Sequence, residues 1–303
     1  DRLGPMKMTW VNHSGHLVTH GGVALLTDPW IEGAVFDDGL ELLLPSVLRP
    51  EDFDLATHLW FSHEHPDHFF PSNLVQVPEP VRTGLKVLYQ DADFGQVQGW
   101  CEGKGFPVQV LKSGRWVELG EDFEVLCQPF SLLDSWMAIR AGGQQIVNLN
   151  DCTLDSEEAA RQVLSSVGDR PIDLVMLQYS FGGYAGETAQ ERLDAGSHML
   201  WRIQMVSRIL RPRFFMPCAS FTWFCHRENH HLNAQSNRIQ KVFRFMEKRC
   251  HGQPIVLLPG ESWEVGTAHK SKKAVGRYRA AFAEKLRATD LRTSSSVDGP
   301  ELQ

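Results

Sequence analysis

The chain has 303 residues, of which 42% are hydrophobic and 22% are charged, and its formal net charge is −7. This composition is typical of a globular protein with enough length for a large buried core. The negative charge argues against nucleic acid as a partner, because phosphate binding normally requires a basic surface. No apolar run is long enough to span a bilayer, so no membrane partner is expected. These features favour a protein that acts on a small molecule.

The cysteines indicate the compartment. The six cysteines form no CxxC pair and show no regular spacing, which favours free thiols in a reducing environment. The first ten residues, DRLGPMKMTW, lack the apolar segment of a secretory signal. Together they predict a cytoplasmic location.

The first half of the chain is rich in short β-type runs separated by turn residues. Residues 16–30 predict a hairpin around two successive glycines, and residues 55–62 predict a short buried strand. Four more strands are expected between residues 81 and 130. A second hairpin with two glycines at its turn is predicted over residues 134–151. This half of the chain therefore builds sheets rather than helices.

The second half alternates helices and strands. Helical spacing over 155–167, 188–210 and 234–250 is interrupted by buried strands over 171–180 and 213–220. A strand-rich half that continues without a break into an alternating half favours one α/β domain with two facing mixed sheets and helices outside them. We expect this domain to span residues 1–267. Residues 268–303 are expected to form a C-terminal helix and a polar, partly disordered tail.

The sequence HLWFSHEHPDH at residues 58–68 is the strongest functional signal. His63, His65 and His68 follow a short apolar strand, so they lie in a loop at a sheet edge, with Asp67 among them. A loop can direct imidazoles at this spacing into one pocket, and imidazole with carboxylate is a ligand set for zinc, iron or manganese. His58 lies within the strand and is expected to be structural. The loop therefore predicts a metal site.

The pattern HxHxDH is the signature of the metallo-β-lactamase superfamily, which this sequence resembles in further places. GHLVTHGGVALLTDPW resembles the opening hairpin, with Asp28 at its end, and IVNLNDCT resembles the strand whose last aspartate, here Asp151, bridges two metals. TDPWIEGAVFDDGLELL, LNDCT, YSFGGYAG and MPCASFTWFCH are together similar to the β-lactamase-like part of CMP-N-acetylneuraminate hydroxylases and to the nonheme diiron thioesterases of natural-product biosynthesis. The resemblance implies a four-layer αββα sandwich.

The resemblance also implies two divalent metal ions and assigns their ligands. It gives metal one two histidines, here His63 and His65. It gives metal two an Asp-His pair and a late histidine, here Asp67, His68 and His226. An aspartate, here Asp151, bridges both metals. His226 is chosen over His230 and His231 because it occupies the position of the histidine in the hydroxylase-like pattern. Asp67 and Asp151 are also assigned to catalysis.

The third histidine of metal one has no counterpart, because the chain contains no histidine from residue 69 to residue 197. Asp134 and Ser131 are the short oxygen donors near the expected place, and Asp134 is the candidate ligand. A water or substrate atom in that position is the alternative. More oxygen donors and fewer nitrogens favour harder cations, so two iron ions are expected in preference to zinc or manganese.

The substrate pocket is predicted from the same stretches. The resemblance places the loop FGGYAGE at the mouth of the site, with Tyr179 and Tyr184 as candidate substrate contacts. Aromatic residues flanking the motif stretches are expected to line an apolar pocket; they are Trp30, Phe36, Trp223 and Phe224.

Three functions remain open. The first is a binuclear-metal hydrolase that uses a metal-bridging hydroxide, since no GxSxG nucleophile is present. The subgroup resemblance favours an acyl thioester substrate and implies a role in secondary metabolism. The second is a nonheme diiron oxygenase, which would need an external reductase because the cysteine–histidine pairs of a Rieske domain are missing. The third is a non-catalytic binding module.

Overall fold

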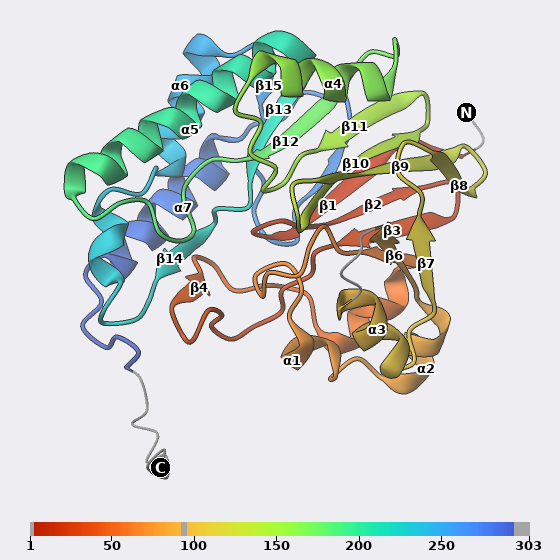
Figure 1. The fold of residues 1–303 in the computed structure, drawn as a ribbon, viewed down its shortest axis with the longest axis horizontal. Helices are drawn as coiled ribbons and strands as arrows, with labels where there is room; N and C mark the ends of the chain where they lie inside the picture. The colour runs from red at the N-terminus through yellow and green to blue at the C-terminus, as the bar shows by residue number, and fades with distance from the viewer. Residues whose placement is uncertain (1–2, 92–95, 294–303) are drawn as a thin grey trace.

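Two seven-stranded β-sheets face each other, and helices cover the outer face of each sheet (Figure 1). The computed structural model describes residues 3–91 and 96–293. Layer by layer, the order is helix, sheet, sheet, helix. The predicted α/β, four-layer αββα architecture is therefore confirmed.

The first sheet comes mostly from the N-terminal part of the chain and has the strand order β16-β1-β2-β3-β5-β6-β7. Its strands are β1 (Lys7–Asn12), β2 (Gly15–His20), β3 (Val23–Thr27), β5 (His58–Trp60), β6 (Lys86–Gln90), β7 (Val108–Leu111) and β16 (Ser262–Glu264). Short helices lie on its outer side: η1 (Pro50–Leu55), α1 (Pro71–Leu74), α2 (Glu79–Gly84) and α3 (Gln96–Gly103).

The second sheet has the order β15-β13-β12-β11-β10-β9-β8. Its strands are β8 (Trp116–Gly120), β9 (Phe123–Phe130), β10 (Asp134–Ala141), β11 (Gln144–Asn148), β12 (Leu174–Gln178), β13 (Phe214–Cys218) and β15 (Gln253–Pro254). The longer helices belong to this half: α4 (Glu157–Val167), α5 (Ala189–Leu210), α6 (Ile239–Arg249) and α7 (Lys272–Lys285). A two-stranded sheet of β4 (Leu40–Leu42) and β14 (Thr222–Phe224) and the turn η2 (His230–Ala234) complete the fold.

Local sequence signals explain most of these elements. The α5 helix begins with a capping box, in which the Thr188 side chain accepts from the backbone N–H of Glu191 and the Glu191 carboxylate accepts from that of Thr188. The strand expected to start at residue 81 begins only at Lys86, because residues 79–84 form α2. Pro80 is the second residue of that helix, where its fixed φ favours helical backbone. Residues 7–12 form β1, although no strand was predicted there.

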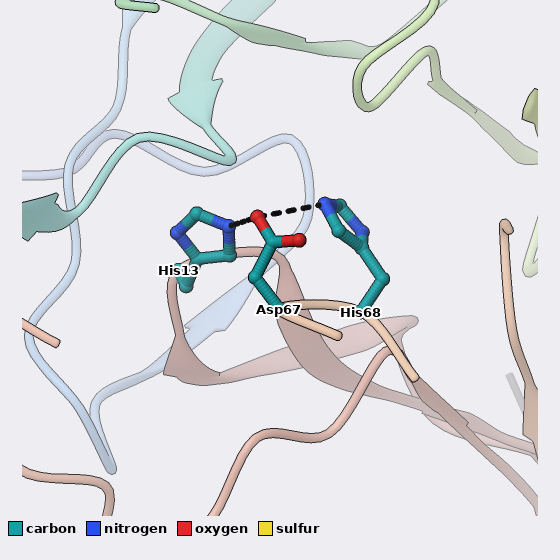
Figure 2. A group of neighbouring side chains, drawn as sticks. All are labelled: His13, Asp67 and His68. Atoms are coloured by element: carbon teal, nitrogen blue, oxygen red, sulfur yellow. Dashed lines mark hydrogen bonds and ion pairs between the residues drawn. The ribbon is translucent and has the colours of Figure 1, made fainter. Parts of the chain in front are cut away.

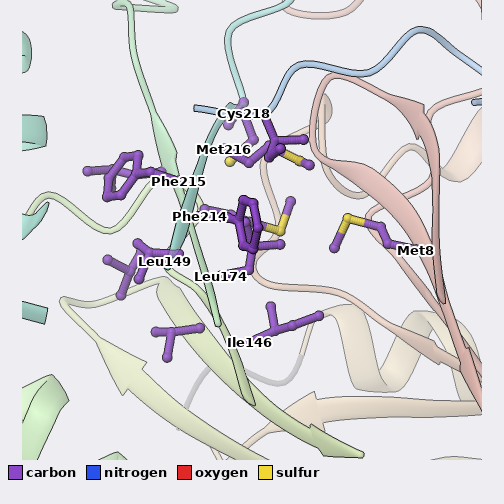
Figure 3. Close-up of a cluster of buried hydrophobic side chains, with 14 of the residues drawn as sticks. Met8, Ile146, Leu149, Leu174, Phe214, Phe215, Met216 and Cys218 are labelled. Atoms are coloured by element: carbon purple, nitrogen blue, oxygen red, sulfur yellow. The ribbon is translucent and has the colours of Figure 1, made fainter. Parts of the chain in front are cut away.

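The core lies between the two sheets. Met8 on β1 faces Ile146, Leu174 and Phe214 of the opposite sheet, and all four side chains are buried (Figure 3). The ring of Phe214 packs edge-on against Trp263 at a centroid distance of 5.2 Å. Burial of this apolar surface supplies the main free energy that holds the sheets face to face.

The α7 helix packs into this same core. Tyr278 is fully buried, and its hydroxyl accepts from Trp10 Nε1 at 3.3 Å and donates to the carbonyl of Leu257 at 3.2 Å. The boundary expected after residue 267 stays a prediction, and the polar end of the predicted tail lies outside the described residues. Within the ranges that the structure describes, no helix combines the length and apolar character needed to cross a bilayer.

Strand direction gathers the polar loops at one edge of the sandwich. β1 and β2, and β2 and β3, pair antiparallel, whereas β3 pairs parallel with β5. The carboxyl ends of β1, β3 and β5 therefore meet at the same edge. In the facing sheet, β9 and β11 run in the same direction, because each pairs antiparallel with β10. The loops that follow these five strands carry the site.

Candidate metal centre

The loop after β5 carries four of the predicted ligands. A turn closes it, because the carbonyl of His65 accepts from the backbone N–H groups of His68 and Phe69 at 2.9 and 2.8 Å. His63 and His68 are fully buried, Asp67 is buried, and His65 is exposed. Each of the four side chains from this turn belongs to at least one group of possible metal ligands.

Three groups of possible ligands form around this loop. In each group, the ligand atoms of three residues lie within 4.8 Å of one another; the groups are His13–Asp67–His68, His63–His68–Asp151 and His63–His65–Asp134. Six of the seven predicted metal ligands are thus brought together. One further residue, His13, joins them and was not predicted.

The spacing of these atoms suits a metal. His63 Nε2 lies 3.7 Å from Asp134 Oδ1, and His68 Nε2 lies 3.5 Å from Asp151 Oδ2. Ligand atoms about 2.0–2.1 Å from a tetrahedral cation stand about 3.3 Å apart, close to these distances.

Unsatisfied polar atoms give an independent test of this fit. Among the described residues, His68 Nε2, Asp67 Oδ1 and Asp151 Oδ1 are buried and make no hydrogen bond. Buried polar atoms without a partner are costly unless something else contacts them. Their position inside the cluster fits cations held between the imidazoles and carboxylates.

Asp28 fixes the orientation of His68. His68 Nδ1 donates to Asp28 Oδ2 at 3.0 Å, which leaves Nε2 for the cluster. Asp28 also accepts from the backbone N–H of Ser62 at 2.8 Å and from Asn150 Nδ2 at 2.6 Å. Asp28 and Asn150 have φ values of +36° and +53°, which are uncommon for residues other than glycine. Such backbone persists only where the surrounding structure holds it.

Asp134 stands at the start of β10, just after the tight turn from β9. Its Oδ2 accepts from Ser131 Oγ at 2.9 Å, and burial raises the pKa of its carboxyl. The neighbouring Ser135 donates from Oγ to the carbonyl of Ser62 at 2.6 Å. Gln90 donates to the carbonyl of Leu133 in the same turn. These contacts tie the Asp134 turn to the histidine loop, although the two come from different sheets.

The histidines of the centre differ in protonation. Burial, together with the charge of His68, lowers the pKa of His63 to about 3, so this imidazole is neutral at pH 7. Burial also acts to lower the pKa of His68, but the carboxylates of Asp67, Asp151 and Asp28 outweigh it and raise the pKa well above its usual range. The adjacent imidazoles hold the pKa of Asp67 well below its usual range, against the effect of burial. A metal bound to His68 must therefore displace a proton.

His226 is placed differently from the other predicted ligands. It forms a backbone bridge with Arg292, and its Nδ1 accepts from the backbone N–H of Glu228 at 3.2 Å. None of the three ligand groups found among the described residues includes it. Its role as a metal ligand stays a prediction.

A cavity of about 570 Å³ opens onto the centre. His65, Asp67 and Asp151 form its metal side. The rest is apolar or neutral: Phe36, Gly39, Leu40, Gln178, Gly182, Gly183, Tyr184, Phe224, Asn229 and Leu232. No lysine or arginine is among these described lining residues. They therefore offer apolar surface and carboxylates but no Lys or Arg charge.

The predicted substrate contacts divide into two sets. Tyr184 lines the cavity, and its side chain is exposed, with the hydroxyl 3.3 Å from Glu187 Oε1. Tyr179, Trp30 and Trp223 are buried side chains outside the lining. Tyr179 packs edge-on against Phe221 in the core at 5.3 Å. Support for substrate contact is therefore strongest for Tyr184, and the roles of the other three stay predictions.

His13 is the main site residue that sequence reasoning missed. Its signal is weak: a single histidine in the sequence NHSG, at a turn before the hairpin that ends at Asp28. Its partner, Asp67, lies 54 residues further along the chain. Only the pairing of β1, β2, β3 and β5 brings the two together.

Known proteins resemble this chain in sequence and in fold. No family model matches the chain. A "UPF0173 metal-dependent hydrolase" from Paracoccus denitrificans is 28% identical over 115 residues, covering 38% of this chain and 44% of that protein. The cytidine monophosphate-N-acetylneuraminic acid hydroxylase of Cricetulus griseus is 22% identical over 284 residues, covering 87% of this chain and 49% of that protein. The chain thus spans less than half the length of these curated relatives.

Two solved structures show the same fold. The metallo-β-lactamase fold protein YhfI from Bacillus subtilis matches with a TM-score of 0.57 at 15% identity, over 86% of this chain and 98% of that one. CmlA, a diiron β-hydroxylase from Streptomyces venezuelae, matches with a TM-score of 0.59 at 16% identity, over 86% of this chain and 54% of that one. The chain has the metallo-β-lactamase fold, and its predicted resemblance to that superfamily is confirmed.

Proposed function

We propose that this protein is a binuclear-metal hydrolase. One observation carries the proposal: six side chains with metal-ligand chemistry converge, with buried unsatisfied atoms between them, at the end of a largely apolar cavity. His63, His65 and Asp134 would hold one cation. Asp67 and His68 would hold the other, and Asp151 would bridge them. The name of one curated relative, a metal-dependent hydrolase, supports the same class.

The chain's own residues define what such a site does. Two cations, when bound, lower the pKa of a bridging water towards neutrality and stabilise the oxyanion of an attacked carbonyl. Asp28 and Ser62 keep His68 fixed, so the ligands need no rearrangement during turnover. Asp67 and Asp151 line both the cluster and the cavity, where each can hydrogen-bond a water aimed at the substrate. No side-chain nucleophile is required.

The cavity supports an apolar acyl substrate. Phe36, Leu40, Phe224 and Leu232 supply its apolar wall, and Gln178 and Asn229 supply neutral hydrogen-bonding groups. The sugar nucleotide in the name of the hydroxylase relative carries a phosphate and a carboxylate, and this described lining has no lysine or arginine to meet those charges. The resemblance to diiron thioesterases favours an acyl thioester, and a role in secondary metabolism in the cytoplasm follows as part of the proposal.

A diiron oxygenase is the second candidate. The observation that favours it is Asp134, because a carboxylate in the place of a histidine makes the ligand set richer in oxygen and better suited to iron. The likeness in fold to a diiron β-hydroxylase is compatible with it. Such an activity would need a supply of electrons.

A pair of histidine variants tests the metal site and the activity together. His65 is exposed, so His65→Ala should leave the fold intact but lower bound metal and abolish hydrolysis of acyl thioesters such as acyl-coenzyme A. His231 is also exposed and belongs to none of the ligand groups, so His231→Ala is the matched control. Metal analysis and turnover should separate the two variants. Full metal content and activity in His65→Ala would overturn the proposed site.

A further inference from the structure

His13 is a buried histidine held in an unusual backbone conformation. It lies in the turn between β1 and β2, is 1% exposed and has a φ of +39°. Left-handed backbone is uncommon for a residue with a side chain, so the surrounding fold must stabilise it. The carbonyl of His13 accepts from the backbone N–H of Ala219, at the end of β13, at 2.7 Å. The turn is thus fixed to both sheets.

The imidazole of His13 is fixed as well. Its ring packs edge-on against Trp30 at 5.6 Å and against His68 at 5.5 Å. Its Nε2 lies 3.1 Å from Asp67 Oδ2, so this oxygen sits between the rings of His13 and His68 (Figure 2). An ionised carboxylate can only accept hydrogen bonds, so His13 is the donor.

We propose that His13 is a positioning residue of the second metal site, because its hydrogen bond from Nε2 holds the Asp67 carboxylate with Oδ1 available to the cation. Oδ1 is buried and makes no hydrogen bond among the described residues. When one oxygen of a carboxylate is already held by a hydrogen bond, the side chain loses little conformational freedom as the other oxygen binds metal. The inference rests on the two-metal site proposed above.

The competing role for His13 is that of a ligand itself, because it shares a group with Asp67 and His68. Its other ring nitrogen argues against this. A metal-bound imidazole almost always donates its second N–H to an acceptor. Nδ1 of His13 is buried and has no hydrogen-bond partner in the described part of the chain. That environment suits a bare lone pair on Nδ1, with the proton on Nε2.

Two variants of equal length separate the roles. In His13→Gln, the amide nitrogen can replace Nε2 as a donor but is a poor metal ligand. In His13→Glu, the carboxylate can bind metal but cannot donate to Asp67. Both residues meet the same backbone strain, so their comparison isolates the hydrogen bond. His20→Gln is the matched control. Buried His20 contacts Asp122 Oδ2 at 3.2 Å at the end of β2, whereas His13 lies in the turn before β2, and His20 belongs to none of the ligand groups among the described residues.

The experiment is a titration of each metal-free variant with Co²⁺ against a competing chelator, which needs no substrate. We expect His20→Gln and His13→Gln to bind two ions with second-site affinities within about threefold of the wild type. His13→Glu should bind the second ion about 10–100-fold more weakly. The opposite order, with His13→Glu tight and His13→Gln weak, would make His13 a ligand and overturn the inference. Equal second-site affinities would overturn it too, whereas a wild-type chain that binds one ion would overturn the two-metal proposal as well.

Discussion

At the scale of single residues, the centre depends on how each polar side chain is held. Asp28 directs His68 by accepting from its Nδ1, and Ser131 donates to Asp134. The HxHxDH residues were predictable because they are adjacent in sequence and their chemistry is specific to metals. The contact of His13 with Asp67 was not, because it depends on strand pairing that a single sequence does not show.

As a proposed ligand, Asp134 should set which metal the site prefers. Asp134→Ala should lower the affinity for metal one while metal two stays bound. The loss should exceed the about 10–100-fold that removal of an outer hydrogen-bond partner costs, because Asp134 is a proposed ligand itself. Asp134→His should restore binding and shift the preference from iron towards zinc, because it replaces an oxygen donor with a nitrogen. Iron and zinc analysis of the purified variants checks both. Unchanged metal content in Asp134→Ala would remove this residue from the ligand set.

His16 should make the metal-free protein sensitive to acid. Its ring is fully buried, and burial lowers the pKa of His16 to about 4. The contact between His16 Nδ1 and the carbonyl of Ser14 opposes this shift only in part. The unfolded chain takes up a proton near its ordinary pKa and the folded chain does not. This contribution to stability is therefore full above about pH 6.5 and is lost as the pH falls towards 4, by about 3 kcal/mol.

Urea unfolding at several pH values checks this prediction. His16→Gln replaces the imidazole with a group that does not titrate, so its stability should fall less between pH 6.5 and 4 than that of the wild type. Parallel curves for the two proteins would show that His16 does not cause the loss.

At the scale of elements, Arg292, which follows α7, holds the segment that forms part of the cavity wall. Arg292 donates to Asp38 Oδ1 at 2.9 Å and to Glu41 Oε1 at 2.7 Å, in the segment that also carries Phe36 and Leu40. Its backbone bridges to His226. The strands of the two large sheets, and the longer helices beside them, were largely predictable from periodicity and turn residues. The β4–β14 pair was not, because three-residue strands separated by about 180 residues leave no local pattern.

Removal of this contact should loosen the cavity wall without unfolding the protein. Arg292→Ala should change the free energy of unfolding little, because the pairs are partly exposed to water. Amide hydrogen exchange over residues 35–42 should become several-fold faster, and KM for an acyl substrate should rise with little change in kcat. Arg208→Ala removes an exposed pair with Glu157 far from the cavity and is the control. Equal exchange over 35–42 in both variants would contradict the prediction.

At the scale of the whole molecule, two sheets of different origin close around one centre. Loops of the first sheet supply the histidines and Asp28, and loops of the second sheet supply Asp134 and Asp151. The four-layer fold could be predicted because the order of strands and helices, together with the HxHxDH signature, points to one known architecture. The late histidine of metal two could not be fixed, because His226 was chosen by its position in a pattern and the fold links it to Arg292.

The central claim is that water, not dioxygen, supplies the new oxygen atom of the product. The most direct measurement is isotope tracing with the metal-loaded protein and a panel of acyl thioesters, once in H₂¹⁸O under nitrogen and once in ordinary water under ¹⁸O₂. A binuclear hydrolase should turn over without dioxygen and place one ¹⁸O from water in the released carboxylate. Turnover that stops under nitrogen, or product that carries ¹⁸O from ¹⁸O₂, would contradict the hydrolase and favour the diiron oxygenase.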